Sequence, residues 1–177
     1  AKSSGTTSDK SKYIPVSMEA LEDCHYKAGK DMLAIYCNNY PETSFFTGKG
    51  IGMGGSHEIT EVNNQEYYTG DLSAILMNNL PFWAEIIRTP DLSIALMKEW
   101  EEKIQKIAEQ TSKQNVVNIS GVPSWSLLLL EKVLKISNKK YINEVWPEFE
   151  VFFHGGVNFE PYRERFFSMF SEHTPRT

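Results

Sequence analysis

Residues 3–12 have the composition of a phosphate-binding loop. They read Ser-Ser-Gly-Thr-Thr-Ser-Asp-Lys-Ser-Lys, and the candidate groups for holding phosphate oxygens are those of Ser3, Ser4, Gly5, Thr6, Thr7 and Lys12. A glycine has no Cβ, so backbone N–H groups beside it can turn toward an anion, and the Lys12 ammonium can reach outer phosphate oxygens. Composition alone favours a frayed tail, because Ser, Thr, Gly and Lys are equally typical of chain ends.

Two further turns are candidates for a ligand site because each follows a predicted buried strand. The first is Gly121–Trp125 and the second is His154–Asn158. In the second turn, paired glycines leave room for a flat ring to lie against the backbone, and Asn158 can cap the next helix. Turns without ligands are common, so the residues alone leave both interpretations open. For His154 we expect a hydrogen-bonded structural role.

Two motifs are rejected as functional sites. Residues 50–55 match the letters of a dinucleotide-binding fingerprint, but that motif requires a preceding buried strand and a helix opening on its last glycine. We expect residues 57–65 to be irregular and residues 45–56 to form a glycine-rich strand or turn beside the site. The four histidines, at positions 25, 57, 154 and 173, lack ligand spacing, so the sequence predicts no metal site built on histidines.

Composition indicates one compact domain that handles small molecules. The 177 residues are 41% hydrophobic and 12% aromatic, and the net charge is -5, which disfavours nucleic acid and anionic membrane as partners. Cys24 and Cys37 are expected to be reduced core residues on one helix. Without a long apolar run or a signal segment, we expect a cytoplasmic protein.

The first half of the chain is expected to be mainly helical. A short strand is predicted over residues 12–16, and a helix capped by Ser17 over residues 17–38, with a core-facing apolar stripe of Leu21, Cys24, Ala28, Met32 and Ile35. Helices are predicted over residues 72–78 and 82–88. Another is predicted to start with Thr89 as its cap and Pro90 at its first position, and to continue to about Ile107. The charges on that last helix, Lys98, Glu101, Glu102, Lys103 and Lys106, are expected to face solvent.

The last third is predicted to be a β-α-β-α unit within residues 115–170. Strands are expected at 115–120 and 149–153, and helices at 123–136 and about 159–170. The strand centres are far enough apart for a parallel pair with a helical crossover. The fold class is therefore α/β, a mainly parallel sheet with flanking helices. Ligands gather at the carboxyl ends of parallel strands, where both candidate turns would lie.

Three ordered motifs resemble the plant auxin-responsive acyl-acid amido synthetases and their bacterial relatives, which belong to the adenylate-forming superfamily. The first is the phosphate loop with Pro15 after it, the second is Gly121–Trp125, and the third is Trp146–Val157 followed by Phe159, Pro161, Tyr162 and Arg163. The resemblance implies that residues 1–177 are a single fragment of the large N-terminal domain of such an enzyme. The family's mobile C-terminal lid domain and its other signatures are not in the chain, so we expect the fragment alone to be inactive.

The resemblance also implies a reaction and its groups. A carboxylic acid would attack the α-phosphate of magnesium-bound ATP, giving acyl-AMP and pyrophosphate, and an amino acid would then take the acyl group. Gly155, Gly156 and Val157 would contact adenine, residues 3–12 would hold the phosphates, and Lys12 would be catalytic. Ser124 and Trp125 are candidates for the acyl pocket, with Leu127 and the stretch 72–83 as further apolar wall.

Several alternatives stay open at this point. The acceptor could be the thiol of coenzyme A, which would make the protein a thioester-forming ligase, or the chain could be a non-catalytic binding module that keeps the fold. The sequence names neither the acid nor the acceptor, nor the oligomeric state, nor the magnesium and ribose ligands. We also expect residues 3–12 to be poorly anchored, because terminal segments without partners fray.

Overall fold

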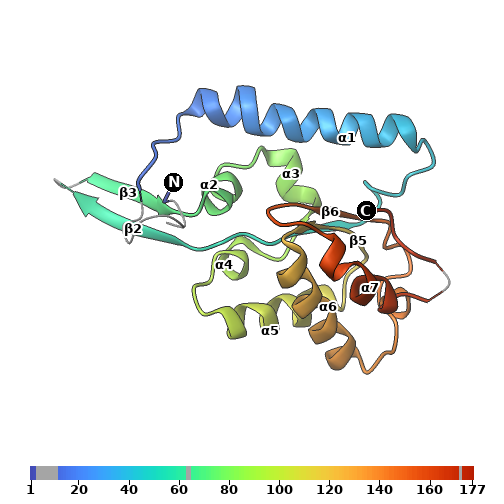
Figure 1. Ribbon diagram of the computed structural model, residues 1–177. Coiled ribbons are helices and arrows are strands. Elements are labelled where there is room, and N and C mark those ends of the chain that lie inside the picture. The colour runs from blue at the N-terminus through green and yellow to red at the C-terminus, as the bar shows by residue number, and fades with distance from the viewer. Residues whose placement is uncertain (3–11, 63–64, 172) are drawn as a thin grey trace. The chain divides into compact units, whose positions relative to one another are not determined.

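A computed structural model describes residues 1–2, 12–62, 65–171 and 173–177, and it divides into two compact units. Unit 1 comprises Ala1–Thr43 and Gly54–Leu80, and unit 2 comprises Ser44–Met53 and Pro81–Thr177. Figure 1 shows the elements of both units along the chain. Each unit is described by itself below.

Unit 2 is built on a four-stranded parallel sheet. Its strands, in spatial order, are β4 (Arg88–Thr89), β1 (Lys49–Gly52), β5 (Val116–Gly121) and β6 (Val151–His154). All three neighbouring pairs are parallel, with Ile51 opposite Thr89 and Ile119, and Ile119 opposite Phe152. The predicted α/β class is confirmed, as is the predicted adjacent parallel pair within residues 115–170.

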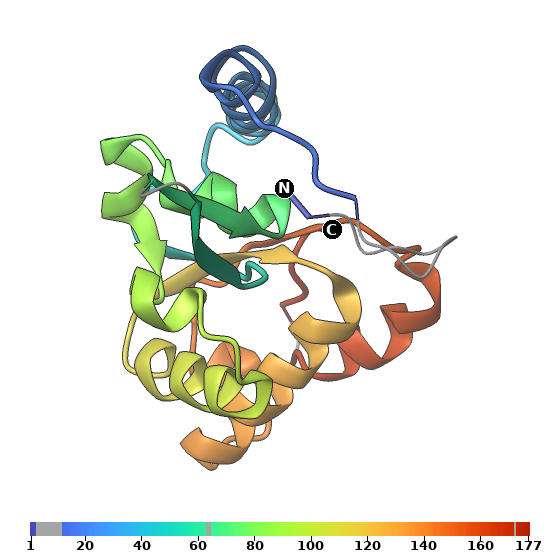
Figure 2. The same cartoon turned by 90° about the vertical axis from the view of Figure 1, so that its left-hand side faces the viewer.

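Helices cover one face of this sheet. The helical elements of unit 2 are α3 (Phe82–Ile87), α4 (Leu92–Ala95), α5 (Trp100–Thr111), α6 (Pro123–Ser137), η2 (Ile142–Glu144) and α7 (Glu160–Ser168). In both Figure 1 and Figure 2, α5, α6 and α7 lie on the same side of the strands. The predicted helices at 123–136 and 159–170 are confirmed as α6 and α7, and α6 is the crossover between β5 and β6.

The core of unit 2 lies between those helices and the sheet. Fully buried aliphatic side chains of α5, β5 and α6 meet an aromatic group formed by Phe149, Phe152, Phe159, Phe166 and Phe170. Each buried ring of this kind contributes roughly 1.5–3 kcal/mol. Trp146 is also fully buried, and its Nε1 donates a hydrogen bond to the carbonyl oxygen of Thr111 at 2.9 Å, so its one polar atom is satisfied.

The glycine-rich segment forms β1, which supports rejection of the dinucleotide fingerprint. Gly50 lies directly under the side chain of buried Asn118, since a Cβ at Gly50 would be 2.6 Å from Asn118 Oδ1. The Asn118 side chain therefore occupies the space that a side chain at position 50 would need. After Gly55 the chain enters a strand rather than the helix that the fingerprint needs.

Unit 1 consists of one long helical segment, a hairpin and a short helix. The π-helical segment η1 (Ala20–Tyr26) continues into α1 (Lys27–Asn39), β2 (His57–Val62) pairs antiparallel with β3 (Gln65–Gly70), and α2 (Leu72–Asn78) follows. Figure 2 looks nearly along α1. Ser17 Oγ accepts a hydrogen bond from the Ala20 N–H at 3.2 Å, which confirms its predicted capping role. Tyr26 Oη donates to the Leu76 carbonyl at 3.0 Å and ties η1 to α2.

Three expectations for unit 1 were wrong. Of the stretch 57–65, residues 57–62 form β2 and Gln65 starts β3, so these residues are not irregular, and the β-branched residues among them favour a strand. The predicted strand over residues 12–16 is reduced to one bridge between Lys2 and Tyr13. Of the apolar stripe on the long helix, only Leu21 is buried, and Cys24, Ala28, Met32 and Ile35 are exposed. Periodicity identifies an amphipathic helix but not the element that covers it.

Two expectations for unit 2 also need correction. Thr89 does not cap a helix, because it pairs with Ile51 in the sheet, and the next helix starts only at Leu92. Lys103 is not on a solvated face, because it is almost completely buried on the same side of α5 as Ile104 and Ile107, with Nζ 6.0 Å from the centre of the Trp100 ring. The long aliphatic stem of a lysine makes such burial possible.

Candidate functional site

The carboxyl ends of β5 and β6 place the two candidate turns side by side. Gly121, the last residue of β5, lies opposite His154, the last residue of β6. Val122 and Pro123 then lead into α6, while residues 155–159 lead into α7. Both turns thus open at the edge of the sheet where ligands of parallel α/β folds bind.

The paired glycines of the second turn have different tasks. Gly156 has φ +81°, a conformation that side chains with a Cβ rarely adopt, and a Cβ there would lie 3.3 Å from Val122 Cγ2 of the other turn. A Cβ at Gly155 would meet nothing within 4 Å. Gly156 therefore shapes the turn, whereas Gly155 presents an open stretch of backbone, beside which Val157 is 46% exposed.

The flanks of the second turn are held by stacking and capping. The ring of His154 stacks on the buried ring of Phe159, with centroids 4.4 Å apart and planes 24° apart. Asn158 Oδ1 accepts a hydrogen bond from the Glu160 N–H at 3.1 Å, which confirms its predicted capping of the following helix. The structure thus gives His154 a stacking contact, where we had expected a hydrogen bond.

A buried hydroxyl group that sequence analysis did not identify lies directly after the first turn. Ser126 is fully buried in the first turns of α6, and its Oγ has no hydrogen-bond partner among the described residues. A Cβ at Gly121 would lie 3.2 Å from this oxygen, so the glycine at the end of β5 leaves room for it. No local pattern marks this serine, because its surroundings depend on the contact between α6 and the end of β5.

Trp125 and Ser124, the candidate acyl-pocket residues, lie at the start of α6. Trp125 is 38% exposed and packs against Trp100 at the start of α5, with ring centroids 4.6 Å apart. Ser124 is half-buried. Their assignment to an acyl pocket stays a prediction, as does a contribution from Leu127, which is part of the core.

The phosphate loop lies mostly outside the described residues. Ser3, Ser4, Gly5, Thr6 and Thr7 fall in the stretch 3–11, so the expectation that the loop is poorly anchored stays untested. Lys12 is described and exposed. On either side of the loop, Lys2 bridges to Tyr13, and the Lys2 N–H donates to the Gly70 carbonyl at 2.7 Å. Lys2 and Tyr13, which flank the loop, are therefore paired with each other, and Lys2 is bonded to the last residue of β3.

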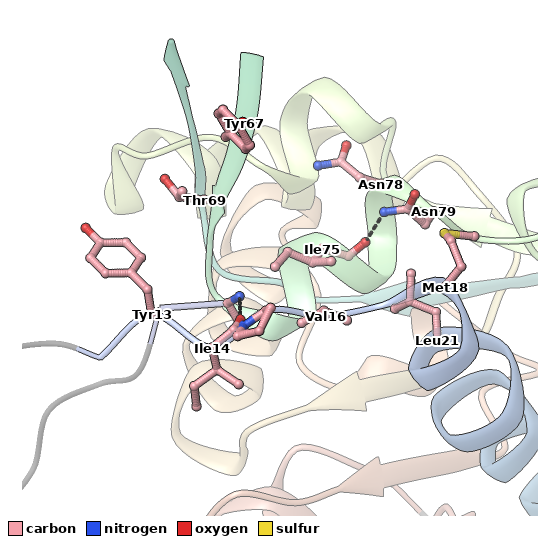
Figure 3. A pocket seen from close by; sticks show the side chains of 12 residues that line it. Tyr13, Ile14, Val16, Met18, Leu21, Tyr67, Thr69, Ile75, Asn78 and Asn79 are labelled. Atoms are coloured by element: carbon pink, nitrogen blue, oxygen red, sulfur yellow. Dashed lines mark hydrogen bonds between the residues drawn. The ribbon is translucent and has the colours of Figure 1, made fainter. Parts of the chain in front are cut away.

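Unit 1 contains a cavity of about 680 Å³ next to this anchor. Its wall comes from the segment that follows the phosphate loop, from the start of the long helix, from β3 and from α2, as Figure 3 shows. Aliphatic side chains dominate it, with two tyrosines and a few neutral polar groups: Tyr13, Ile14, Val16, Met18, Leu21, Tyr67, Thr69, Ile75, Asn78 and Asn79. Its size and lining are typical of a site for a small, mainly apolar molecule.

Sequence reasoning found only part of this cavity. The stretch 72–83 was proposed as apolar wall, and Ile75, Asn78 and Asn79 from it do line the cavity. Tyr67 and Thr69 were missed, because no element was predicted for residues 66–69. No spacing along the chain links the segments that form the wall.

Three acidic side chains of the described residues have a shifted pKa, and one of them, Glu19, lies in the chain between the cavity residues Met18 and Leu21. Backbone N–H groups of Tyr141 and Lys140 lower the pKa of Glu144, and the backbone and Ser17 lower that of Glu19, while burial raises the pKa of Tyr26. Across the described part of the chain, no three His, Cys, Asp or Glu side chains are grouped so that they could hold a metal ion.

Comparison with known proteins gives one match. A family model described as the GH3 family N-terminal domain matches residues 1–175. No curated protein and no solved structure matches the chain. Within the described residues, no helix has the length and hydrophobicity needed to cross a bilayer.

Proposed function

The chain belongs to the GH3 family, the acyl-acid amido synthetases within the adenylate-forming enzymes, and from this premise we propose that it activates a carboxylic acid with ATP and passes the acyl group to an amino acid. In the first step, a carboxylate oxygen attacks the α-phosphorus of ATP, and pyrophosphate leaves with the electrons of the broken P–O bond. In the second step, the amine attacks the acyl carbon, AMP leaves, and the amine loses a proton.

The open backbone at Gly155 is the observation that carries the nucleotide part of this proposal. Gly155 has free space where a side chain would be, and it lies in a turn at the carboxyl edge of a parallel sheet. A flat ring such as adenine can lie against such a backbone. We assign adenine contacts to Gly155, Gly156 and Val157.

The phosphate part rests on residue chemistry. Hydroxyl and backbone N–H groups of Ser3, Ser4, Gly5, Thr6 and Thr7 would hold phosphate oxygens, and Lys12 would neutralise charge that develops on them during attack. Magnesium would supply further neutralisation by bridging phosphate oxygens. No nucleophile from the protein is needed, because both steps are direct displacements on the substrate.

We assign the apolar body of the acid to the cavity in unit 1. Part of the cavity wall, Tyr13 to Leu21, directly follows Lys12 in the chain, so the residues that we assign to phosphate are contiguous in sequence with part of the wall that would surround the acid. None of the described side chains that line the cavity belongs to Asp, Glu, Lys, Arg or His. A carboxylate would find no charged side chain there, and the terminal ammonium of Ala1 in the wall already donates to the Ile14 carbonyl, so we place the charged end toward the phosphates and the apolar body inside.

Acid-dependent exchange of pyrophosphate into ATP tests the proposal on the full-length protein. A panel of carboxylic acids should contain members that support exchange, and analysis of products with amino acids or coenzyme A then distinguishes amide from thioester formation. The proposal would be contradicted if none of the acids supported exchange and ATP did not raise the melting temperature. A ligand at 100 times its dissociation constant should add ~2.7 kcal/mol to the unfolding free energy.

A pair of glycine variants locates the adenine. Gly155→Leu should abolish ATP binding without changing the melting temperature, because the new side chain enters open space. Gly29→Leu is the matched control, since a Cβ at Gly29 on α1 also meets nothing within 4 Å. Equal ATP affinity in the two variants would place adenine elsewhere.

A further inference from the structure

Asn78 is the unusual residue in the wall of the unit 1 cavity. It is the last residue of α2, its side chain lines the cavity, and its Nδ2 group is buried with no hydrogen-bond partner among the described residues. Asn79, next to it in the same wall, differs, because its Nδ2 donates to the Ile75 carbonyl at 2.9 Å. Figure 3 shows that bond and shows the Asn78 amide nitrogen turned toward the side of Tyr67.

An unpartnered buried amide is unfavourable and needs an explanation. A buried donor without an acceptor keeps its full desolvation cost, whereas an apolar side chain of the same shape would avoid that cost. The terminal torsion of asparagine is soft, and a rotation about it would bring the Nδ2 group from its covered position toward the cavity that the side chain lines. An acceptor atom on a bound molecule would then satisfy it.

The rest of the wall restricts what that molecule can be. Tyr13 and Tyr67 provide flat aromatic surface, and Ile14, Ile75 and Leu21 provide aliphatic surface. Aromatic side chains of this kind pack well against flat rings. The volume of about 680 Å³ admits a molecule larger than one ring.

We propose that Asn78 is a specificity-determining residue that donates a hydrogen bond to an oxygen atom on the body of the acid. The protein therefore selects aromatic carboxylic acids that carry a hydroxyl, ether or keto oxygen away from the carboxylate. This inference rests on the proposed function, because it takes the occupant of the cavity to be the acid that is adenylated. It adds the substrate class and the residue that recognises it.

Pairs of acids that differ in one atom test this role in the full-length protein. Methoxyphenylacetic acids with the methoxy group in the ortho, meta or para position are compared with the ethylphenylacetic acids of the same shape, in which CH₂ replaces the oxygen. The measurement is the ratio of kcat/KM for each pair in acid-dependent pyrophosphate exchange. Wild type should prefer the methoxy acid by about tenfold at one ring position, the effect of one hydrogen bond.

Three variants separate recognition by Asn78 from a general effect on the cavity. Asn78→Leu keeps the approximate shape but removes the donor, so the ratio should fall to about one. Asn78→Gln keeps a donor on a longer side chain and should retain part of the preference. Asn79→Ala removes a neighbouring amide whose donor is already used, so the ratio should stay at the wild-type value whatever happens to the overall rate.

A binding measurement distinguishes failure of this inference from failure of the proposed function. The same acid pairs are titrated calorimetrically into the protein in the presence of an α,β-methylene ATP analogue, which cannot release pyrophosphate. One outcome is that exchange is absent, while the methoxy acid of a pair binds more tightly than the ethyl acid, and only in proteins with a donor at position 78. That result would contradict the proposed reaction and support recognition by Asn78. Absence of acid binding, a wild-type ratio near one for every pair, or a ratio unchanged in Asn78→Leu would overturn the inference.

Discussion

At the scale of single residues, the charge of Lys12 is the feature whose removal should matter most for the reaction. If its ammonium neutralises phosphate oxygens more strongly in the transition state than in the ground state, Lys12→Ala should lower the rate of adenylation by ~10²–10³-fold. Lys12→Arg should restore only part of the rate, because the broad planar guanidinium fits a narrow loop less well than a compact ammonium. Pyrophosphate exchange by the two variants measures both effects.

The competing view is that Lys12 is only an exposed surface lysine. Its removal would then change the unfolding free energy by no more than about 0.5 kcal/mol and leave exchange near the wild-type rate. Near-wild-type exchange by Lys12→Ala would remove Lys12 from the mechanism.

Substitution by alanine should lower the unfolding free energy at one glycine of the second turn and leave it nearly unchanged at the other. Gly156→Ala should lower the unfolding free energy by roughly 1–3 kcal/mol, because alanine is strained in the backbone conformation of Gly156. The new Cβ would also crowd Val122. Gly155→Ala should stay within about 0.5 kcal/mol of wild type. Urea denaturation of both variants checks this, and similar midpoints would show that the turn is not held as described.

At the scale of elements, η2 offers a pH-dependent contribution to stability. Glu144 Oε2 accepts hydrogen bonds from the backbone N–H groups of Tyr141 and Lys140, each at 2.9 Å, and these bonds lower the pKa of Glu144 below the ordinary 4.5. A carboxyl group with a lowered folded-state pKa adds stability above its unfolded pKa and loses it as pH falls through the folded value.

Glu144→Gln therefore should destabilise the protein near neutral pH, and the difference from wild type should shrink as the solution is acidified below pH 4.5. Other carboxyl groups titrate in the same range, but they do so in both proteins, so the difference between the two unfolding curves isolates Glu144. A difference that is constant with pH would mean that the charge of Glu144 contributes nothing.

Elements marked by local sequence patterns, such as a proline at a helix start, were predictable from the sequence. Elements whose structure depends on pairing with a segment far away in the sequence were not. The β-α-β-α unit was found because β5 is a short apolar run, Pro123 marks the start of α6, and Asn158 caps the helix after it. Residues 57–62 were misjudged because polar residues are frequent in β2, which among the described strands pairs only with β3. Thr89 was misjudged because its role depends on pairing with Ile51.

At the scale of the whole molecule, the two units should differ in local stability. The large hydrophobic core lies entirely within unit 2, whereas Tyr36 is the only described residue of α1 that is buried. Segments with little buried apolar surface open at lower free energy. Amides of α1 should therefore exchange with deuterium much faster than amides of β5. Mass spectrometry can measure this exchange. Equal protection of the amides in the two segments would contradict the prediction.

The candidate sites were predictable to different degrees for the same physical reason. The turn at Gly155 could be located because a parallel β-α-β unit brings the ends of its two strands together. The cavity could not, because residues from Tyr13 to Leu21, from β3 and from α2 meet only after the chain has folded. The burial of the Asn78 amide depends on the same tertiary contacts, so no sequence pattern predicts it.

The division of the chain has a consequence for how this enzyme family can diversify. The chain leaves unit 2 after Met53 and re-enters it at Pro81, so β3 and α2 sit in one uninterrupted insertion between β1 and α3. The described residue pairs of the parallel sheet all lie outside this insertion. Five of the twelve residues that line the cavity lie in this insertion. We therefore expect that substitutions or grafting there can change this part of the wall while the sheet that presents Gly155 keeps its sequence and its register.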